Sequence, residues 1–318
     1  MTLPLLAGCL NPAGGMSARE QAQLEHRALD LLFRATQSEQ DIVRANAIEA
    51  LVNVAPQAAL GYFRAAVDDQ SELVRFNGCI AAGEVRDQAA QEAIRRRLSD
   101  PAPRVRLAAA AAACRLGDTN AARTLVSTLN DHPDEFLRAD AAFLIGKVGE
   151  PAAIARLQWA ARREKSTKVL VHIYAALARL EERTAIHRLI NYAQGDTASR
   201  IVALQSMCEL NDERASDALL YRLNDARDYL VPRLIAARAL GRLGSNAGYK
   251  LAAESLHHAA ADLNETMSVR VNAALALGAI GDRRALPLLK SLAEAENDPR
   301  TQVAACYAIC QITARRRE

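Results

Sequence analysis

The sequence predicts an all-α fold, an α-solenoid (curved superhelix) of about nine stacked helix pairs, and three observations lead to this prediction. Alanine, the strongest helix former, accounts for 66 of the 318 residues. Aromatic residues make up only 4% of the chain, and there are only 15 Gly and 10 Pro, whereas a sheet-rich fold needs more β-formers and more turns. The third observation is a motif that recurs nine times at intervals of 30 to 37 residues.

The motif is a hydrophobic residue followed by an anchor residue, with a small residue three positions after the anchor and a branched aliphatic residue ten positions after it. The anchors are Arg44, Arg75, Arg106, Arg138, Leu170, Arg200, Arg233, Arg270 and Gln302. The small residues are Ala47, Gly78, Ala109, Ala141, Ala203, Ala236, Ala273 and Ala305, with Ile173 as the exception. A motif in phase over the whole chain predicts one continuous array.

Each repeat divides into two helices. In the third repeat the pattern predicts helices over residues 90–98 and 104–116, separated by the sequence SDPAP, in which Asp can cap a helix start and Pro can occupy its first turn. Gly117 then ends the second helix, and glycines at 149, 244 and 281 recur at the same place. Stacking nine such pairs predicts a curved rod roughly 80–90 Å long with polar caps, one of them at residues 315–318.

The anchor Arg has a structural interpretation in this array. We expect each one to reach an acidic or carbonyl group in the turn before it or in the neighbouring repeat. Acidic residues stand six to eight positions before four of the anchors, at Asp69, Asp100, Asp131 and Asp225. The alternative is that the arginines form an anion-binding stripe.

The motif resembles HEAT repeats, and specifically the short Ala-rich HEAT-like repeats of phycobilisome lyase subunits. The resemblance rests on Val-Arg at 74–75, 105–106 and 269–270, each followed by an Ala-rich helix, and on endings such as LGAIGD at 277–282; it covers about residues 28–314. It implies the fold but not one function, because such repeats occur in lyase subunits, scaffolds, transport receptors, DNA glycosylases and a di-iron hydroxylase.

The first sixteen residues carry a separate pattern. Leu6-Ala7-Gly8-Cys9 matches the lipobox of bacterial lipoprotein signal peptides, in which the thiol carries a diacylglycerol, and NPAGG follows as a tether. A signal peptide also needs a basic start and roughly 7–15 apolar residues, which this stretch lacks. We expect residues 1–16 to be a lipoprotein signal remnant and tether, lipidated on Cys9, and residues 17–318 to be the solenoid. An accidental match and a true start at Met16 are the alternatives.

The sequence offers few groups for catalysis or metal binding. The five cysteines beyond Cys9 fall four or eight positions after an anchor, where other repeats carry Ala or Gly, so we expect buried thiols. No HExxH, P-loop, GxGxxG or Gly-x-Ser-x-Gly motif is present, and no His precedes Glu as in the HEAT-like di-iron hydroxylases. His257-His258 is expected at or just after a first helix over residues 249–261, exposed or contacting a metal or partner. We expect no enzyme, no cofactor and no metal site.

The inner face of the array is the predicted binding surface. Residues two, five and nine positions after each anchor should be exposed there. In the first two repeats they are neutral to acidic, as with Glu49 and Glu84, and further along they are mainly basic. The predicted binding residues are Phe143, Lys147, His172, Arg179, Arg238 and Arg242, with Phe143 as an aromatic anchor. An ordinary solvated helix face is the alternative.

These features predict a non-enzymatic scaffold that binds a protein partner on its concave face. The predicted location is the bacterial cell envelope, with the membrane reached only through lipid on Cys9; the alternative is a cytoplasmic lyase or chaperone-lyase subunit. Nucleic-acid binding through Arg115, Lys147, Arg179, Arg238 and Arg242 is a weaker alternative, because a net charge of +3 is too balanced for an obvious nucleic-acid binder. No small-molecule substrate is indicated.

Overall fold

The computed structural model describes residues 16–258, 262–295 and 298–315. Cys9 and the lipobox lie outside this range, as do Arg316, Arg317 and Glu318 of the predicted polar cap. The described residues form α-helices and short 3₁₀ turns and contain no strand. No described helix combines the length and the apolar character needed to cross a bilayer.

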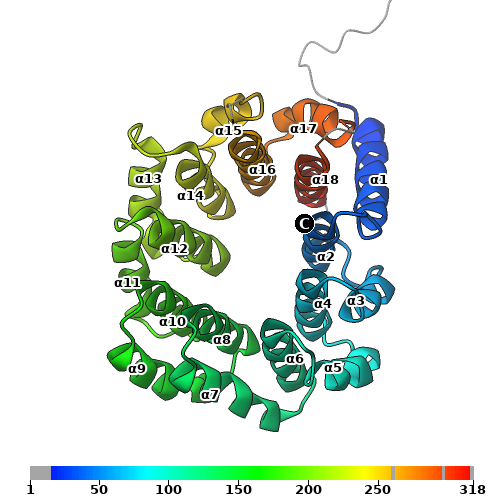
Figure 1. The fold of residues 1–318 in the computed structure, drawn as a ribbon. Helices are drawn as coiled ribbons and strands as arrows, with labels where there is room; N and C mark the ends of the chain where they lie inside the picture. Colours follow the sequence, from blue (N-terminus) through cyan, green and yellow to red (C-terminus); the bar gives the residue numbers. More distant parts are fainter. Residues whose placement is uncertain (1–15, 259–261, 296–297, 316–318) are drawn as a thin grey trace, which may run out of the picture.

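The helices form nine consecutive pairs, each with an outer and an inner member (Figure 1). The outer helices are α1 (Ala18–Ala35), α3 (Leu60–Val67), α5 (Gln91–Arg97), α7 (Ala122–Asp131), α9 (Ile154–Arg163), α11 (Ala185–Tyr192), α13 (Ser216–Asn224), α15 (Tyr249–Ser255) and α17 (Leu286–Ala293). The inner helices are α2 (Asp41–Val54), α4 (Glu72–Glu84), α6 (Pro103–Arg115), α8 (Glu135–Val148), α10 (Thr167–Arg179), α12 (Thr197–Leu210), α14 (Leu230–Arg242), α16 (Leu263–Ile280) and α18 (Pro299–Ala314).

The predicted helix ends are confirmed in the third repeat. There α5 and α6 match the predicted bounds within a residue, and Pro103 is the first residue of α6. Gly117, eleven positions after its anchor, has φ +109°. The residue at this position has a positive φ in seven of the repeats, including Glu181 at φ +63° in a repeat that lacks the glycine. The predicted helix over 249–261 was too long, because α15 ends at Ser255, before His257 and His258.

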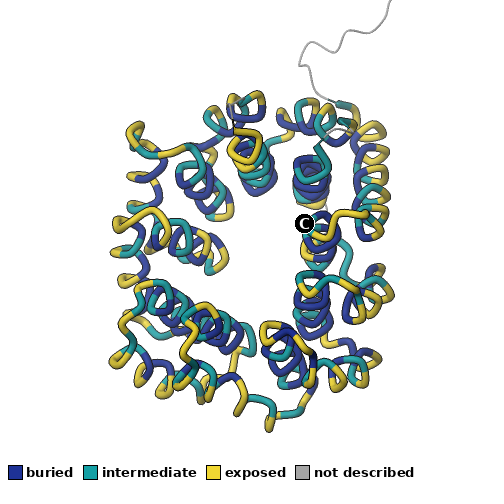
Figure 2. Tube along the Cα trace, in the orientation of Figure 1, coloured by how far each residue is buried: buried dark blue, intermediate teal, exposed yellow. Residues whose placement is uncertain are grey.

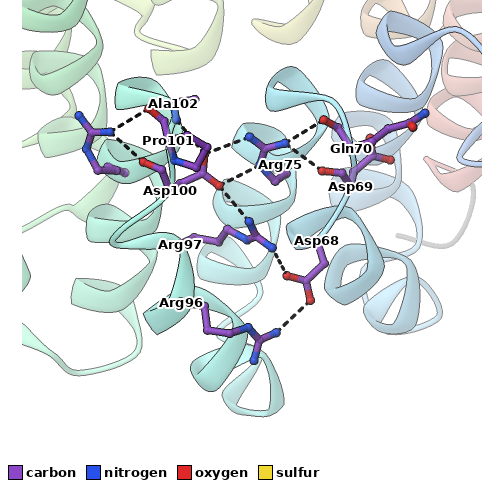
Figure 3. Close-up of polar contacts among 10 residues, drawn as sticks. Asp68, Asp69, Gln70, Arg75, Arg96, Arg97, Asp100, Pro101 and Ala102 are labelled. Atoms are coloured by element: carbon purple, nitrogen blue, oxygen red, sulfur yellow. Dashed lines mark hydrogen bonds and ion pairs between the residues drawn. The ribbon is translucent and has the colours of Figure 1, made fainter.

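Four of the seven anchor arginines bind the turns of two repeats at once, as Arg75 does in Figure 3. Nη1 of Arg75 donates to the main-chain oxygens of Asp69 and Gln70 in its own turn, while Nε and Nη2 donate to the Asp100 carboxylate of the next turn at 2.9 and 3.0 Å. The same double contact joins Arg44 to Asp69, Arg138 to Glu164 and Arg200 to Asp228. The expected structural role is therefore confirmed for these anchors.

Two of the four predicted acidic partners do not bind an anchor among the described residues. Asp225 instead pairs with Arg222 at 3.2 Å, and Asp131 is exposed at the end of α7. Arg106 donates only to the main-chain oxygens of Asp100 and Pro101. Where an anchor binds a carboxylate, that carboxylate lies in the turn of the next repeat and not in the anchor's own turn. Spacing within one repeat could not predict this pairing.

The array closes into a ring, which corrects the expectation of an open rod with polar caps (Figures 1 and 2). The last inner helix, α18, packs against both α1 and α2. Leu24, Ala28 and Leu32 of α1 are 0–3% exposed and share one core with Cys306 and Cys310 of α18. The hydrophobic core therefore continues through the seam between the first and last repeats, and neither end needs a polar cap.

Close contacts between inner helices set the curvature of the ring. A Cβ on Gly146 of α8 would lie 2.8 Å from Cα of Ala176 on α10, so these two backbones approach as closely as glycine allows. Gly83 and Gly278, eight positions after their own anchors, contact Ala112 and Ala308 in the same way. The eighth position after the anchor, where the sequence carries Ala, Gly or Cys in several repeats, is thus a point of close contact between inner helices.

Candidate functional site

The inner helices enclose a central space, here called the lumen, and many of the residues two, five and nine positions after the anchors line it. A cavity of about 340 Å³ in the lumen is lined from opposite walls, by Glu49 and Glu84 on one side and by Phe143, Lys147 and Arg238 on the other. A second cavity of about 1110 Å³, the mouth, lies at the C-terminal ends of the inner helices and includes Lys147, Arg179 and Arg242. The predicted binding face is thus an enclosed surface instead of an open groove.

Four of the six predicted binding residues form one cluster on α8 and α10. The Phe143 ring meets His172 edge to face at 6.4 Å between centroids, with Lys147 Nζ 5.6 Å and the Arg179 guanidinium 5.4 Å from its centre. Burial lowers the pKa of His172, which favours the neutral imidazole. Phe143 is therefore held between a ring and two cations and is only partly exposed.

Most lumen cations already have partners within the chain. Lys147 pairs with Glu84 of α4 at 2.7 Å and lies 4.0 Å from Glu209 of α12. Arg179 pairs with the same Glu209. Arg115 donates to the main-chain oxygens of Gly83 and Lys147 at the C-terminal ends of α4 and α8. The basic half of the inner face thus neutralises the acidic half across the lumen.

Arg238 and Arg242, the remaining predicted residues, differ from those cations. They lie one turn apart on α14, and both line the central cavity. Neither forms a hydrogen bond or an ion pair within 4.0 Å to any residue that the structure describes, although Arg238 interacts electrostatically with Glu49. These two guanidinium groups are therefore available to a ligand.

A small pocket of about 130 Å³ adjoins Arg238 and spans four inner helices. Val271 and Leu275 of α16 and Val303 of α18 form its apolar floor, and Glu49 of α2 borders it. Glu49 is exposed to the lumen, but the surrounding ring partly desolvates it, and this raises the pKa of its carboxyl group despite Arg238. The pocket thus combines an apolar floor with one acid, Glu49, and two guanidinium groups, those of Arg238 and Arg300.

Three further residues line the site that were not among the predicted binding residues. Gln205 and Glu209 of α12 and Tyr307 of α18 line the central cavity. They stand five or nine positions after their anchors, so the same positional rule would have found them in the sixth and ninth repeats. Tyr307 accepts a hydrogen bond from Gln311 at 3.0 Å, which leaves its own hydroxyl proton free to be donated.

The described residues provide little for catalysis. No group of three or more His, Cys, Asp or Glu side chains among them could hold a metal ion. Cys208, the thiol that lines the central cavity, has its pKa raised by burial, which disfavours the reactive thiolate. The site is instead suited to binding by charge and shape.

Repeated helix pairs stacked in one continuous array define an α-solenoid. The family model for HEAT repeats matches residues 62–144, 122–208 and 216–310, so the chain belongs to the HEAT-repeat family. No curated protein sequence matches the chain.

Three solved structures are similar to this chain in fold. The CpcE–CpcF complex of phycocyanin lyase from Nostoc sp. PCC7120 is 22% identical, with a TM-score of 0.45, covering 70% of this chain and 91% of that one. Human deoxyhypusine hydroxylase is 20% identical (TM-score 0.39; 82% and 98% covered), and the YibA protein of E. coli is 18% identical (TM-score 0.37; 83% and 96% covered). At this level of similarity the activities of those proteins do not transfer to this chain.

Proposed function

We propose that this protein is a non-enzymatic interaction scaffold whose protein partner binds in the lumen. The observation that carries the proposal is the pair Arg238 and Arg242, which line the central cavity without an ion-pair partner among the described residues. Lys147 is held by Glu84, Arg179 by Glu209, and Arg115 by main-chain oxygens. Arg242 is exposed and Arg238 is partly exposed, so both guanidinium groups can be reached by a ligand that enters the lumen.

The closed ring determines what kind of partner can bind. A folded domain is too large for a central cavity of about 340 Å³, whereas an extended segment can enter through the mouth. An extended segment can also contact several inner helices at once, as solenoid repeats allow. The partner is therefore a flexible polypeptide segment that reaches Phe143, Arg238 and Arg242.

The test is photo-crosslinking in the native cell. A photoreactive phenylalanine replaces Phe143 in the lumen in one variant and Trp159 on the outer helix α9, 40% exposed, in the matched control. The proposal expects Phe143 to cross-link to one protein, within a single contiguous segment that is unstructured when free. Cross-links from the outer position alone would overturn it.

The structure favours neither alternative function. Lys147, Arg179 and Arg115 are engaged within the chain, so the lumen lacks the continuous basic surface that nucleic acid requires. No described lumen residue specifically favours a lyase subunit.

We also propose that the scaffold is lipid-anchored through Cys9 in a bacterial envelope. The Leu6-Ala7-Gly8-Cys9 pattern and the NPAGG tether before α1 support this. Intact mass of the native protein tests it: a chain that starts at Cys9 with an added diacylglycerol, recovered in membranes, is the expected result. A soluble chain that retains residues 1–8, or one that starts at Met16, would show that the match is accidental.

A further inference from the structure

The unpaired guanidinium groups of α14 define a site with two chemically distinct parts. Arg238 and Arg242 stand at i and i+4, so both project from one helix face toward the lumen. Planar guanidinium groups at this spacing are suited to carboxylates, because each can donate two parallel hydrogen bonds. The two guanidinium groups are the cationic, carboxylate-binding part of the site.

The second part is the apolar pocket beside Arg238. Its volume of about 130 Å³ is close to that of engineered protein cavities of about 150 Å³ that accept benzene. Val271 and Leu275 on its floor are only partly buried. The pocket therefore has room for one apolar side chain and would remove these two residues from water when filled.

Glu49 competes with a ligand carboxylate for Arg238. Its carboxylate is the acidic group of the pocket and interacts electrostatically with Arg238, so it partly neutralises the guanidinium that a ligand would use. The other lumen acids, Glu84 and Glu209, are held by Lys147 and Arg179. Glu49 is thus the internal competitor of an incoming carboxylate.

We propose that Arg238, Arg242 and the adjoining pocket bind an acidic stretch of an extended polypeptide. One apolar side chain of the ligand enters the pocket, and neighbouring carboxylates pair with the two guanidinium groups. This inference rests on the proposed function, and it adds the chemistry that the partner segment must carry.

The probe is a fluorescein-labelled peptide, Gly-Ser-Asp-Leu-Glu-Ser-Gly, measured by fluorescence anisotropy with the full chain. The comparison peptides carry Lys in place of Asp and Glu, or Ser in place of Leu. The acidic peptide is expected to bind at least about tenfold more tightly than the Lys peptide, since like charges would then meet at the site. Loss of Leu is expected to cost several-fold in affinity.

Variants of the protein locate the binding. Arg238→Gln with Arg242→Gln is expected to weaken the acidic peptide about tenfold or more. Glu49→Gln is expected to tighten it, a gain that misfolding cannot mimic. The control is Arg227→Gln, an exposed arginine before α14 whose side chain has no hydrogen bond or ion pair to a described residue, and it should change nothing.

Two results would overturn the inference. One is that the acidic and Lys peptides bind with equal affinity, or that neither binds at millimolar concentration. The other is an Arg238/Arg242 variant that binds the acidic peptide as tightly as the Arg227→Gln control. If the Phe143 position still cross-links to a partner in cells, the lumen remains the partner site and only the proposed ligand chemistry fails. Without that cross-link, the proposed function fails as well.

Discussion

Lys147 on α8 and Glu84 on α4 form a 2.7 Å ion pair, although 63 residues separate them in the chain. Between them lies Arg115 of α6, whose guanidinium donates to the main-chain oxygens of Gly83 and Lys147. The ends of three successive inner helices are thus joined at the mouth of the lumen. Charged side chains from separate repeats therefore hold the C-terminal ends of α4, α6 and α8 together on the inner side of the ring.

The first prediction concerns this ion pair. Both side chains are about a quarter exposed, so the pair should contribute modestly to stability. A double-mutant cycle with Lys147→Met and Glu84→Gln, followed by urea unfolding, should give a coupling free energy of roughly 0.5–1 kcal/mol. A coupling indistinguishable from zero would mean that the two helices do not hold these side chains together.

The second prediction concerns the anchor arginines. Burial alone would raise the pKa of Asp100, but hydrogen bonds from Arg75, the Ala102 amide and Arg97 outweigh burial and hold that pKa below its usual range. Removing Arg75 would leave this buried carboxylate short of a partner. Arg75→Met should therefore lower the free energy of unfolding by about 3 kcal/mol.

Arg106→Met is the matched control for Arg75→Met. Arg106 binds only the main-chain oxygens of Asp100 and Pro101, so its loss strands no carboxylate and should cost about 1–2 kcal/mol. Equal losses in the two variants, measured by urea unfolding, would contradict the assigned role of the Arg75–Asp100 pair.

The third prediction concerns the approach of α8 and α10. Gly146→Ala places a Cβ 2.8 Å from Cα of Ala176, so one helix must move, at a cost of about 1–3 kcal/mol. Gly61→Ala on the outer helix α3 meets nothing within 4 Å and should stabilise by about 0.5–1 kcal/mol. Thermal unfolding of the two variants gives the comparison, and a stabilising Gly146→Ala would refute the close contact.

The fourth prediction concerns the thiols at the seam. Cys306 and Cys310 of α18 are buried in the core that α1 shares, and burial raises the pKa of both, that of Cys306 to about 12. Because the thiolate is the reactive form, both should react with a thiol reagent only after unfolding. Half-buried Cys114, with a pKa of about 11, should react first among the cysteines that the structure describes. Rapid labelling of Cys306 in the native protein would show that the seam is open.

Local features of the fold could be predicted from the sequence, but ring closure could not. Helix bounds near Pro103 and Gly117 depend on residues within a few positions of each other, and so does the inward direction of Phe143 and Arg238. Closure depends on the sum of small rotations between successive repeats, which no single motif encodes. The partners of Lys147 and Arg179 follow from the curvature of the array, so the sequence could indicate a basic surface but not its neutralisation.

Closure of the ring is the central claim, and one cross-link tests it most directly. Arg27 of α1 lies 3.8 Å from Glu294, which follows α17, and both side chains are more than half exposed. In an Arg27→Lys variant, a zero-length carbodiimide reagent should join position 27 to Glu294 within the monomer, while Arg27→Gln should give no such product. A rod of roughly 80–90 Å would hold these residues far apart. Absence of the intramolecular product from a folded Arg27→Lys monomer would contradict the closed ring and the enclosed lumen with it.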